Sequence, residues 1–211
     1  MNLFILDEDP VESARQYCDI HTTKIILEAA GCMCAAHWEH GFPLRESSPL
    51  PLRIGQYRSA SHHNNHVTQW VRESAGNYLW TAQHAIELCN EYSSRYHLRT
   101  GLHRRHASEP IVQWLADNVP FDVPHGPRAP FTLATTPECY SHDAVATYWV
   151  YYVAFKRHLT TWKWTATPWW YSMLDKMHVD GASVSDLLTA ALDIRNGSYD
   201  IHESIIAERL A

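Results

Sequence analysis

Basic residues are scarce in this sequence, and their scarcity limits what the protein can bind. Seventeen Lys and Arg stand against 23 Asp and Glu among 211 residues, which gives a formal net charge of −6. A protein that holds nucleic acid by charge alone needs a basic excess, so a general polyanion binder is excluded. Hydrophobic residues make up 45% of the chain and charged residues 19%, proportions that exclude a disordered protein.

Long apolar runs and paired cysteines are also missing. No run approaches the roughly 18 apolar residues of a membrane span, so we expect no membrane partner. The first residues carry no basic segment ahead of an apolar one, so they do not form a signal peptide, and Met1 is interpreted as a natural start. The five Cys are odd in number and have no paired spacing, which indicates reduced thiols and predicts a cytoplasmic protein.

Helical signals dominate the rest of the chain, because strand alternation is faint and no internal repeat or low-complexity tract occurs. Residues 97–110 have the composition of a basic loop, and five prolines between 120 and 137 predict an extended segment. Helix formers, helical offsets and capping residues predict helices over 11–33, 67–96, 111–116, 142–164 and from Ser183 or Ser185 to about 194.

The domain organisation follows from these elements. We predict a mainly α fold in which residues 1–170 form one compact helical domain. Residues 171–211 are expected to form a C-terminal, aromatic-rich helical extension packed on it.

Three residues of the first predicted helix form a candidate acid/base group. His21, Lys24 and Glu28 are separated by three, four and seven positions, so they share one helical face. Burial beside an apolar surface shifts the pKa of such groups towards neutrality. The alternative is an ordinary surface pair of Lys24 and Glu28, worth about 0.3 kcal/mol, beside a polar His21. The neighbouring stripe is expected to face the core: Ile20, Leu27, Gly31 and Cys34.

The same helix resembles a known family. Asp19-Ile20-His21, with Glu28 seven residues after the histidine, is similar to the first catalytic helix of the pyrimidine-dimer DNA glycosylases encoded by phages. His66-Val67-Thr68, the stretch from Glu87 to Tyr92, Arg95 and Tyr96 continue the likeness. Tyr57 through His66 is similar to the Tyr-Lys-Asn-His-Pro element of bacterial relatives, and the opening resembles phage-encoded proteins that begin Leu-Asp-x-Asp-Pro. The likeness covers roughly residues 1 to 100.

The resemblance implies a compact helical fold and an N-glycosylase that acts on a damaged or modified base, in some members with strand scission. It implies DNA or a nucleotide as partner, no cofactor, and the host cell's cytoplasm as location. In this family the α-amine at the N-terminus forms a Schiff base and a helical Glu assists. Glu28 matches that acid, and His21 matches the family's histidine.

The chain departs from the family at three positions. Leu27 and Gly31 stand where the family has phosphate-binding arginines. Residue 2 is Asn, before which the initiator Met is usually retained, so the nucleophilic amine would be that of Met1. Lys24 is the substitute nucleophile, because a lysine pressed against apolar groups loses its proton more readily. Water activated by Glu28 is the other route.

Residues outside the first helix are expected to bind the substrate. The resemblance assigns this role to His66 and Tyr57, and a local basic patch assigns phosphate contacts to three arginines. A base extruded from DNA needs an aromatic pocket, and the nine Trp residues and 11 Tyr residues offer many rings. The rings that follow Pro168 are expected at the surface. The substrate-binding candidates are therefore His66, Tyr57, Arg95, Arg104, Arg105, Trp169 and Trp170.

Two other functional classes stay open. His62 and His66, four residues apart, are the centre of a possible metal site that His37, or His103 with His106, would complete. No Cys-x-x-Cys or His-Glu-x-x-His motif accompanies them, so a metal is not the favoured reading. The alternatives to a glycosylase are a metal-dependent enzyme acting on nucleotides and a nucleic-acid-binding module without catalysis. The base recognised, the choice of DNA or free nucleotide, and the oligomeric state are left open.

Overall fold

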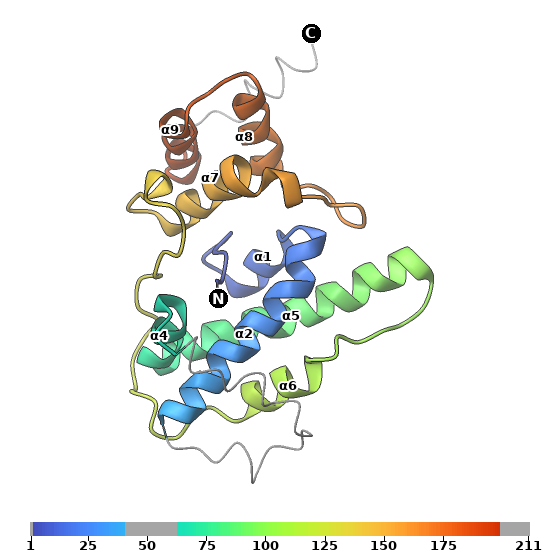
Figure 1. The fold of residues 1–211 in the computed structure, drawn as a ribbon, viewed down its shortest axis with the longest axis vertical. Helices are drawn as coiled ribbons and strands as arrows, with labels where there is room; N and C mark the ends of the chain where they lie inside the picture. The colour runs from blue at the N-terminus through green and yellow to red at the C-terminus, as the bar shows by residue number, and fades with distance from the viewer. Residues whose placement is uncertain (1, 41–62, 199–211) are drawn as a thin grey trace. The chain divides into compact units, whose positions relative to one another are not determined.

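A computed structural model describes residues 2–40 and 63–198 of the chain (Figure 1). All regular secondary structure in these ranges is helical, which confirms the predicted mainly α fold. No helix in the described ranges is both long and apolar enough to cross a lipid bilayer. The elements are α1 (Pro10–Arg15), α2 (Asp19–Glu39), α4 (His66–Glu73), α5 (Ala75–Thr100), α6 (Glu109–Asp117), η3 (Pro137–Cys139), α7 (Ala144–Lys156), η4 (Arg157–Leu159), α8 (Trp169–Val179) and α9 (Val184–Arg195).

The chain divides into two compact units. The first unit comprises Met1–Ala134 and Leu159–Thr167, and the second comprises Thr135–His158 and Pro168–Ala211. The domain boundary predicted from the sequence, between residues 170 and 171, falls inside the second unit. The segment Leu159–Thr167 belongs to the first unit although it follows α7 in the sequence.

The helix predicted over residues 11–33 is two helices, α1 and α2, with a turn at residues 16–18 between them. Asp9 caps α1 by accepting hydrogen bonds from the backbone N–H groups of the next two non-proline residues. The turn forms because the guanidinium of Arg95 donates to the carbonyl oxygens of Arg15 and Tyr17, which a continuous helix would use internally. A residue 78 positions from Tyr17 therefore stabilises the break.

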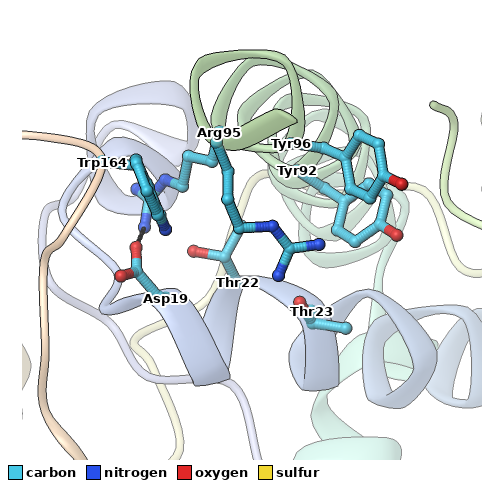
Figure 2. A pocket seen from close by; sticks show the side chains of 8 residues that line it. Asp19, Thr22, Thr23, Tyr92, Arg95, Tyr96 and Trp164 are labelled. Atoms are coloured by element: carbon cyan, nitrogen blue, oxygen red, sulfur yellow. Dashed lines mark hydrogen bonds and ion pairs between the residues drawn. The ribbon is translucent and has the colours of Figure 1, made fainter. Parts of the chain in front are cut away.

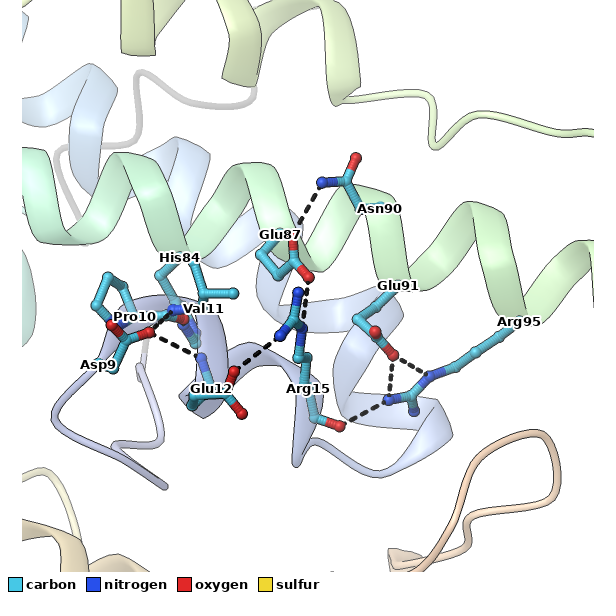
Figure 3. Close-up of polar contacts among 10 residues, drawn as sticks. All are labelled: Asp9, Pro10, Val11, Glu12, Arg15, His84, Glu87, Asn90, Glu91 and Arg95. Carbon is cyan, nitrogen blue, oxygen red and sulfur yellow. Dashed lines mark hydrogen bonds and ion pairs between the residues drawn. The ribbon is translucent and has the colours of Figure 1, made fainter.

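Contacts from α5 hold α1 in place (Figure 3). Arg15 Nε donates to Glu87 Oε1 at 2.9 Å, and the ring nitrogen Nδ1 of His84 lies 2.9 Å from the Pro10 carbonyl oxygen. His84 is fully buried, and burial lowers its pKa to about 4. The neutral ring therefore belongs to the packing between the two helices.

The helix predicted over residues 67–96 is also two helices, α4 and α5, separated at Ser74. The Ser74 hydroxyl caps α5 by accepting from the Asn77 backbone N–H. Gly76 sits so close to the proline-rich segment that a Cβ there would lie 2.2 Å from the backbone nitrogen of Arg128. The buried Asn77 side chain then binds both sides, donating to Trp70 O and accepting from Ala129 N–H. The start of α5 is therefore shaped to anchor the extended segment.

In the second unit, α7, α8 and α9 pack against one another around stacked aromatic rings. The rings of Trp149 and Trp170 are parallel, with centroids 4.8 Å apart. The sequence did not predict α8, and α7 ends at Lys156 rather than near residue 164. The chain leaves the helix because residues 159–167 bond to the start of α2: Thr161 O accepts from Asp19 N–H, and Lys163 N–H donates to Asp19 Oδ2.

Candidate functional site

The N-terminal segment runs beside α2 and reaches Glu28. Leu3 through Leu6 are buried without forming a strand, and the Phe4 carbonyl oxygen accepts a 2.6 Å hydrogen bond from the Tyr17 hydroxyl. The Asn2 side chain donates to the Ala134 carbonyl oxygen at 2.9 Å. These contacts fix the second residue of the chain over α2, so that its backbone nitrogen meets a carboxylate.

The carboxylate of Glu28 is largely enclosed and has two partners. Its Oε2 accepts a hydrogen bond from the backbone N–H of Asn2 at 2.5 Å, and its Oε1 lies 3.4 Å from Lys24 Nζ. The Glu28 side chain is 16% exposed, so it borders solvent without pointing into it. Sequence spacing placed Lys24 beside Glu28, and the structure brings the two together with the N-terminal segment.

Lys24 is not pressed against apolar groups as the sequence predicted. Its side chain is 65% exposed, so apolar groups do not enclose the ammonium and the predicted reason for its activation is wrong. Met1, the other predicted nucleophile, lies outside the described residues.

His21 is buried rather than presented to a substrate. Its Nδ1 lies 3.2 Å from Cys18 Sγ, and its ring lies 4.7 Å from that of Phe4. This placement does not present His21 to a substrate as a member of the predicted acid/base group. His21 instead packs beneath the N-terminal segment and helps to position it.

The apolar stripe predicted to face the core is divided. Gly31 and Cys34 are buried, but Ile20 and Leu27 are exposed. The second half of α2 is enclosed from Ala29 through His37, whereas its first half is open on the Ile20 side. The prediction was therefore wrong for the two residues in the first half of the helix.

The start of α4 meets α2 one turn beyond Glu28. The Thr68 hydroxyl lies 3.5 Å from Cys32 Sγ, and burial raises the pKa of that thiol to about 12, so Cys32 stays protonated. His66 is exposed in the first turn of α4. Within the described part of the chain it makes no hydrogen bond to Glu28, so its predicted role in substrate binding stays a prediction.

Those of the proposed metal-ligating histidines that the structure describes do not form a site. His37 is buried with its Nε2 2.9 Å from the Tyr78 hydroxyl, and burial lowers its pKa to about 4. His62 lies outside the described residues, and His106 Nδ1 accepts from the Ser108 backbone N–H. Among residues 2–40 and 63–198, no three His, Cys, Asp or Glu side chains are grouped closely enough to hold a metal ion.

Arg95, predicted to meet phosphate, is instead fully engaged inside the protein. A guanidinium has five N–H donors, and all five here have acceptors: two on the Glu91 carboxylate, one on Asp19, and one each on the carbonyl oxygens of Tyr17 and Arg15. Its side chain is 5% exposed. No donor remains for a phosphate, so the prediction for Arg95 is wrong.

The other predicted arginines are accessible. The Arg104 guanidinium lies over the Tyr96 ring, 5.4 Å from its centroid. The Arg105 side chain is 84% exposed and lies 3.4 Å from Glu109 Oε1. Both are open to an anionic partner.

The two predicted tryptophans differ in accessibility. Trp169 is 50% exposed, but Trp170 is 1% exposed beneath the Trp149 ring, so the prediction that Trp170 contacts a substrate is wrong. Tyr57, another candidate from the sequence, lies outside the described residues.

A pocket that sequence reasoning missed lies where α2 begins and α5 ends (Figure 2). Its volume is about 90 Å³. The spacing of Tyr92, Arg95, Tyr96 and Arg99 on one helical face was a signal for it, but the wall supplied by the segment after α7 could not be read from that spacing. The lining residues are Asp19, Thr22, Thr23, Tyr92, Arg95, Tyr96, Arg99 and Trp164.

Comparisons with known proteins identify no relative of this chain. No protein-family model, curated protein or solved structure matches the chain. The function must therefore be argued from the arrangement of the residues themselves.

Proposed function

We propose that this protein is a DNA base-processing enzyme, an N-glycosylase in which Glu28 works beside the start of the chain. The observation that carries the proposal is the hydrogen bond from the Asn2 backbone nitrogen to Glu28 Oε2. The resembling family combines an N-terminal amine with a helical Glu, and the motif alone says nothing about where the start of this chain lies. The approach of residue 2 to Glu28 is therefore independent support.

The proposed chemistry needs a nitrogen nucleophile and a group that moves protons. Removal of Met1 converts the Asn2 nitrogen into a primary amine 2.5 Å from Glu28 Oε2. If Met1 is retained, the amine is that of Met1, one residue before Asn2. The amine attacks C1′ of the nucleotide, the N-glycosidic bond breaks, and the base leaves with its bonding electrons. Glu28 accepts the proton that the nitrogen gives up and returns it to the leaving base. The C1′–O4′ bond of the sugar then breaks, O4′ keeps the bonding electrons and takes a proton from solvent, and the nitrogen lone pair forms the C1′=N bond of the Schiff base.

Lys24 has a supporting part in this scheme. Its ammonium lies 3.4 Å from Glu28 Oε1 and is largely exposed. It supplies a cation on the same side of α2 as Glu28, whereas exposed Leu27 and buried Gly31 supply none. We expect Lys24 to orient the carboxylate and to attract the phosphates of the substrate rather than to form the covalent bond.

The test is to trap the intermediate. The purified full chain is incubated with duplex oligonucleotides that carry pyrimidine dimers, abasic sites or hypermodified bases, and borohydride is added to reduce a Schiff base. We expect a covalent adduct that Glu28→Gln abolishes and Lys24→Ala retains, with Glu73→Gln, an exposed acid at the end of α4, as the matched control. Mass spectrometry of the intact protein shows whether Met1 is retained, and peptide mapping locates the adduct.

Asn2→Thr sharpens this test, because methionine removal is efficient before a small second residue. The variant places a free α-amine at the position of the Asn2 nitrogen. A higher adduct yield than in the parent chain identifies the amine, whereas released base without adduct identifies water as the nucleophile. If no substrate in the whole panel gives released base or adduct, the proposal is contradicted.

A second candidate is a nucleic-acid-binding module that has kept the fold without the chemistry. The observation that favours it is the pair of positions at which the resembling family has arginines: Leu27 and Gly31 offer no phosphate contact here. In that case Glu28→Gln leaves DNA binding unchanged and the parent chain shows no turnover.

A further inference from the structure

The pocket between α2 and α5 is built differently from the Glu28 site and lies on another side of α2. Asp19 and Glu28 are nine residues apart, and at about 100° per residue they point to opposite sides of the helix. Asp19, Thr22 and Thr23 line the pocket, while Glu28 faces the N-terminal segment. A ligand in the pocket therefore has its own set of contacts.

The charged groups beneath the pocket already have partners within the protein. Asp19 Oδ1 accepts from Arg95 Nη1 at 3.2 Å, and Oδ2 accepts from the Lys163 backbone N–H at 2.8 Å. Glu91 receives two further N–H groups of Arg95. The acidic side chain in the pocket is thus occupied and does not repel an anionic ligand as an unpaired carboxylate would.

Aromatic rings stand on two sides of the pocket. Figure 2 shows Trp164 on one side and Tyr92 and Tyr96 on the other, with Thr22 and Thr23 from α2 between them. The two tyrosine rings are stacked, with centroids 6.2 Å apart. Every nucleobase has a flat face that can stack on such rings, so the walls of the pocket suit any of the bases.

Two cations lie at the same end of α5. The guanidinium groups of Arg99 and Arg104 lie 5.0 and 5.4 Å from the centroid of the Tyr96 ring. Within residues 2–40 and 63–198, neither forms an ion pair with a carboxylate. Unlike Arg95, both keep donors for an outside anion.

We propose that this pocket binds an unpaired nucleotide, whose base edge enters between Trp164 and the two tyrosines while Arg99 and Arg104 contact its phosphate. The volume of about 90 Å³ is smaller than the roughly 150 Å³ that encloses a benzene ring, so the base is only partly inserted. Partial insertion fits a base that stays attached to its backbone. The choice of a nucleic-acid ligand rests on the proposed function, but the site itself does not involve Glu28.

The test measures binding of a fluorescein-labelled single-stranded oligothymidylate to the full chain by fluorescence anisotropy. Trp164→Ala is expected to weaken binding about 5- to 150-fold, the range that loss of one base stack gives. Arg99→Gln is expected to lower the salt dependence of log K by about 0.7. Phe121→Ala, which removes an aromatic ring that is 86% exposed in another loop, and Arg157→Gln, at a half-exposed arginine of the second unit, are the matched controls and are expected to change binding less than twofold.

Competitors identify the source of the ligand. Thymidine monophosphate that displaces the strand at similar nucleotide concentration assigns the pocket to free nucleotides, and failure to displace assigns it to nucleic acid. Inorganic phosphate that competes as well as thymidine monophosphate overturns the proposal, because the base then contributes nothing. Circular dichroism shows whether each variant is folded. If Trp164→Ala does not fold, Arg99→Gln tests the proposal alone.

The two proposals fail separately. If Trp164→Ala and Arg99→Gln both bind the oligonucleotide as the parent chain does, the proposal that the pocket binds a nucleotide is contradicted, whether or not Glu28 catalyses base release. Binding that depends on Trp164 and Arg99, without base release from any substrate, upholds the pocket and contradicts the glycosylase. Glu28→Gln is expected to leave binding in the pocket within twofold of the parent chain.

Discussion

The two sides of α2 carry the same kinds of charged group and leave them in opposite states. On the side that faces α5, Asp19 is held by a guanidinium whose five donors are all used. On the other side, Glu28 accepts one backbone N–H and has an exposed lysine nearby. A carboxylate offers about four acceptor sites, so Glu28 can still receive a proton or a substrate. Availability, rather than charge, separates a group that can react from one that holds the fold.

The difference follows from the surroundings of each side. On the α5 side the cation is Arg95, whose side chain is 5% exposed, and a buried charge must be paired in full because an unpaired one costs several kcal/mol. His37, near the other end of α2, is buried as a neutral ring whose Nε2 lies 2.9 Å from the Tyr78 hydroxyl. On the Glu28 side the cation is Lys24, whose side chain is 65% exposed and therefore keeps contact with solvent. A solvated cation needs fewer partners from the protein, so the carboxylate beside it keeps unused bonding capacity.

The largest effect on activity is expected from substitution of Glu28. Glu28→Gln should reduce base release about 10²- to 10⁴-fold, because the amide cannot move protons. The free energy of unfolding should change by less than about 1 kcal/mol, because an amide oxygen still accepts the Asn2 N–H. Activity comes from gel-resolved product and stability from urea unfolding of the same preparation. A large loss of stability with unchanged activity would reverse the assignment of roles.

The largest effect on stability is expected from substitution of Arg95. Arg95→Met should lower the free energy of unfolding by about 3–5 kcal/mol, because Asp19, Glu91 and two carbonyl oxygens lose the N–H groups that Arg95 donates to them. Arg105→Gln, at an exposed side chain, should stay within about 0.5 kcal/mol of the parent. Urea unfolding followed by circular dichroism measures both. A cost below 1 kcal/mol for Arg95→Met would show that the network is not needed for the fold.

The network around Arg95 also explains what the sequence could and could not predict. Helical spacing correctly predicted the mainly α fold and placed Lys24 beside Glu28, because both depend on neighbours within a turn. The turn between α1 and α2 depends on a guanidinium 78 residues from Tyr17, so no local pattern predicted it. For the same reason, Arg95 looked like one more cation of a basic patch.

The pocket was beyond sequence reasoning for a related cause. Its Trp164 wall comes from a segment that leaves α7 and bonds to the start of α2, and that contact joins residues 144 positions apart. Trp170 was misjudged in the same way, because its burial depends on a ring stacked from α7. Composition indicated that some rings would line a pocket, but only tertiary packing selects which of them do.

Acid should weaken the buried side through its histidines. Burial lowers the pKa of His37 and of His84 to about 4, against an ordinary value of 6.5, so the unfolded chain binds more protons between these values. Their contribution is fully present above pH 6.5 and is lost as the pH falls towards 4, on the order of 3 kcal/mol for each histidine. Urea unfolding across this range measures the slope, and His37→Gln should flatten it. A slope equal to that of the parent chain would exclude His37 as its source.

The smallest effect sharpens the comparison on the open side of α2. Leu27→Arg restores a cation where the resembling family has one, and because Leu27 is exposed the change should cost less than about 0.5 kcal/mol of stability. Binding of duplex DNA should tighten a few-fold, and the salt dependence of log K should rise by about 0.9 for one new phosphate contact. Gly31→Arg is the matched comparison, since Gly31 is buried and an arginine there should destabilise the fold by more than 1 kcal/mol. Fluorescence anisotropy at several salt concentrations measures the slope. An unchanged slope in Leu27→Arg would mean that DNA does not approach this side of the helix, and the glycosylase proposal would lose its docking surface.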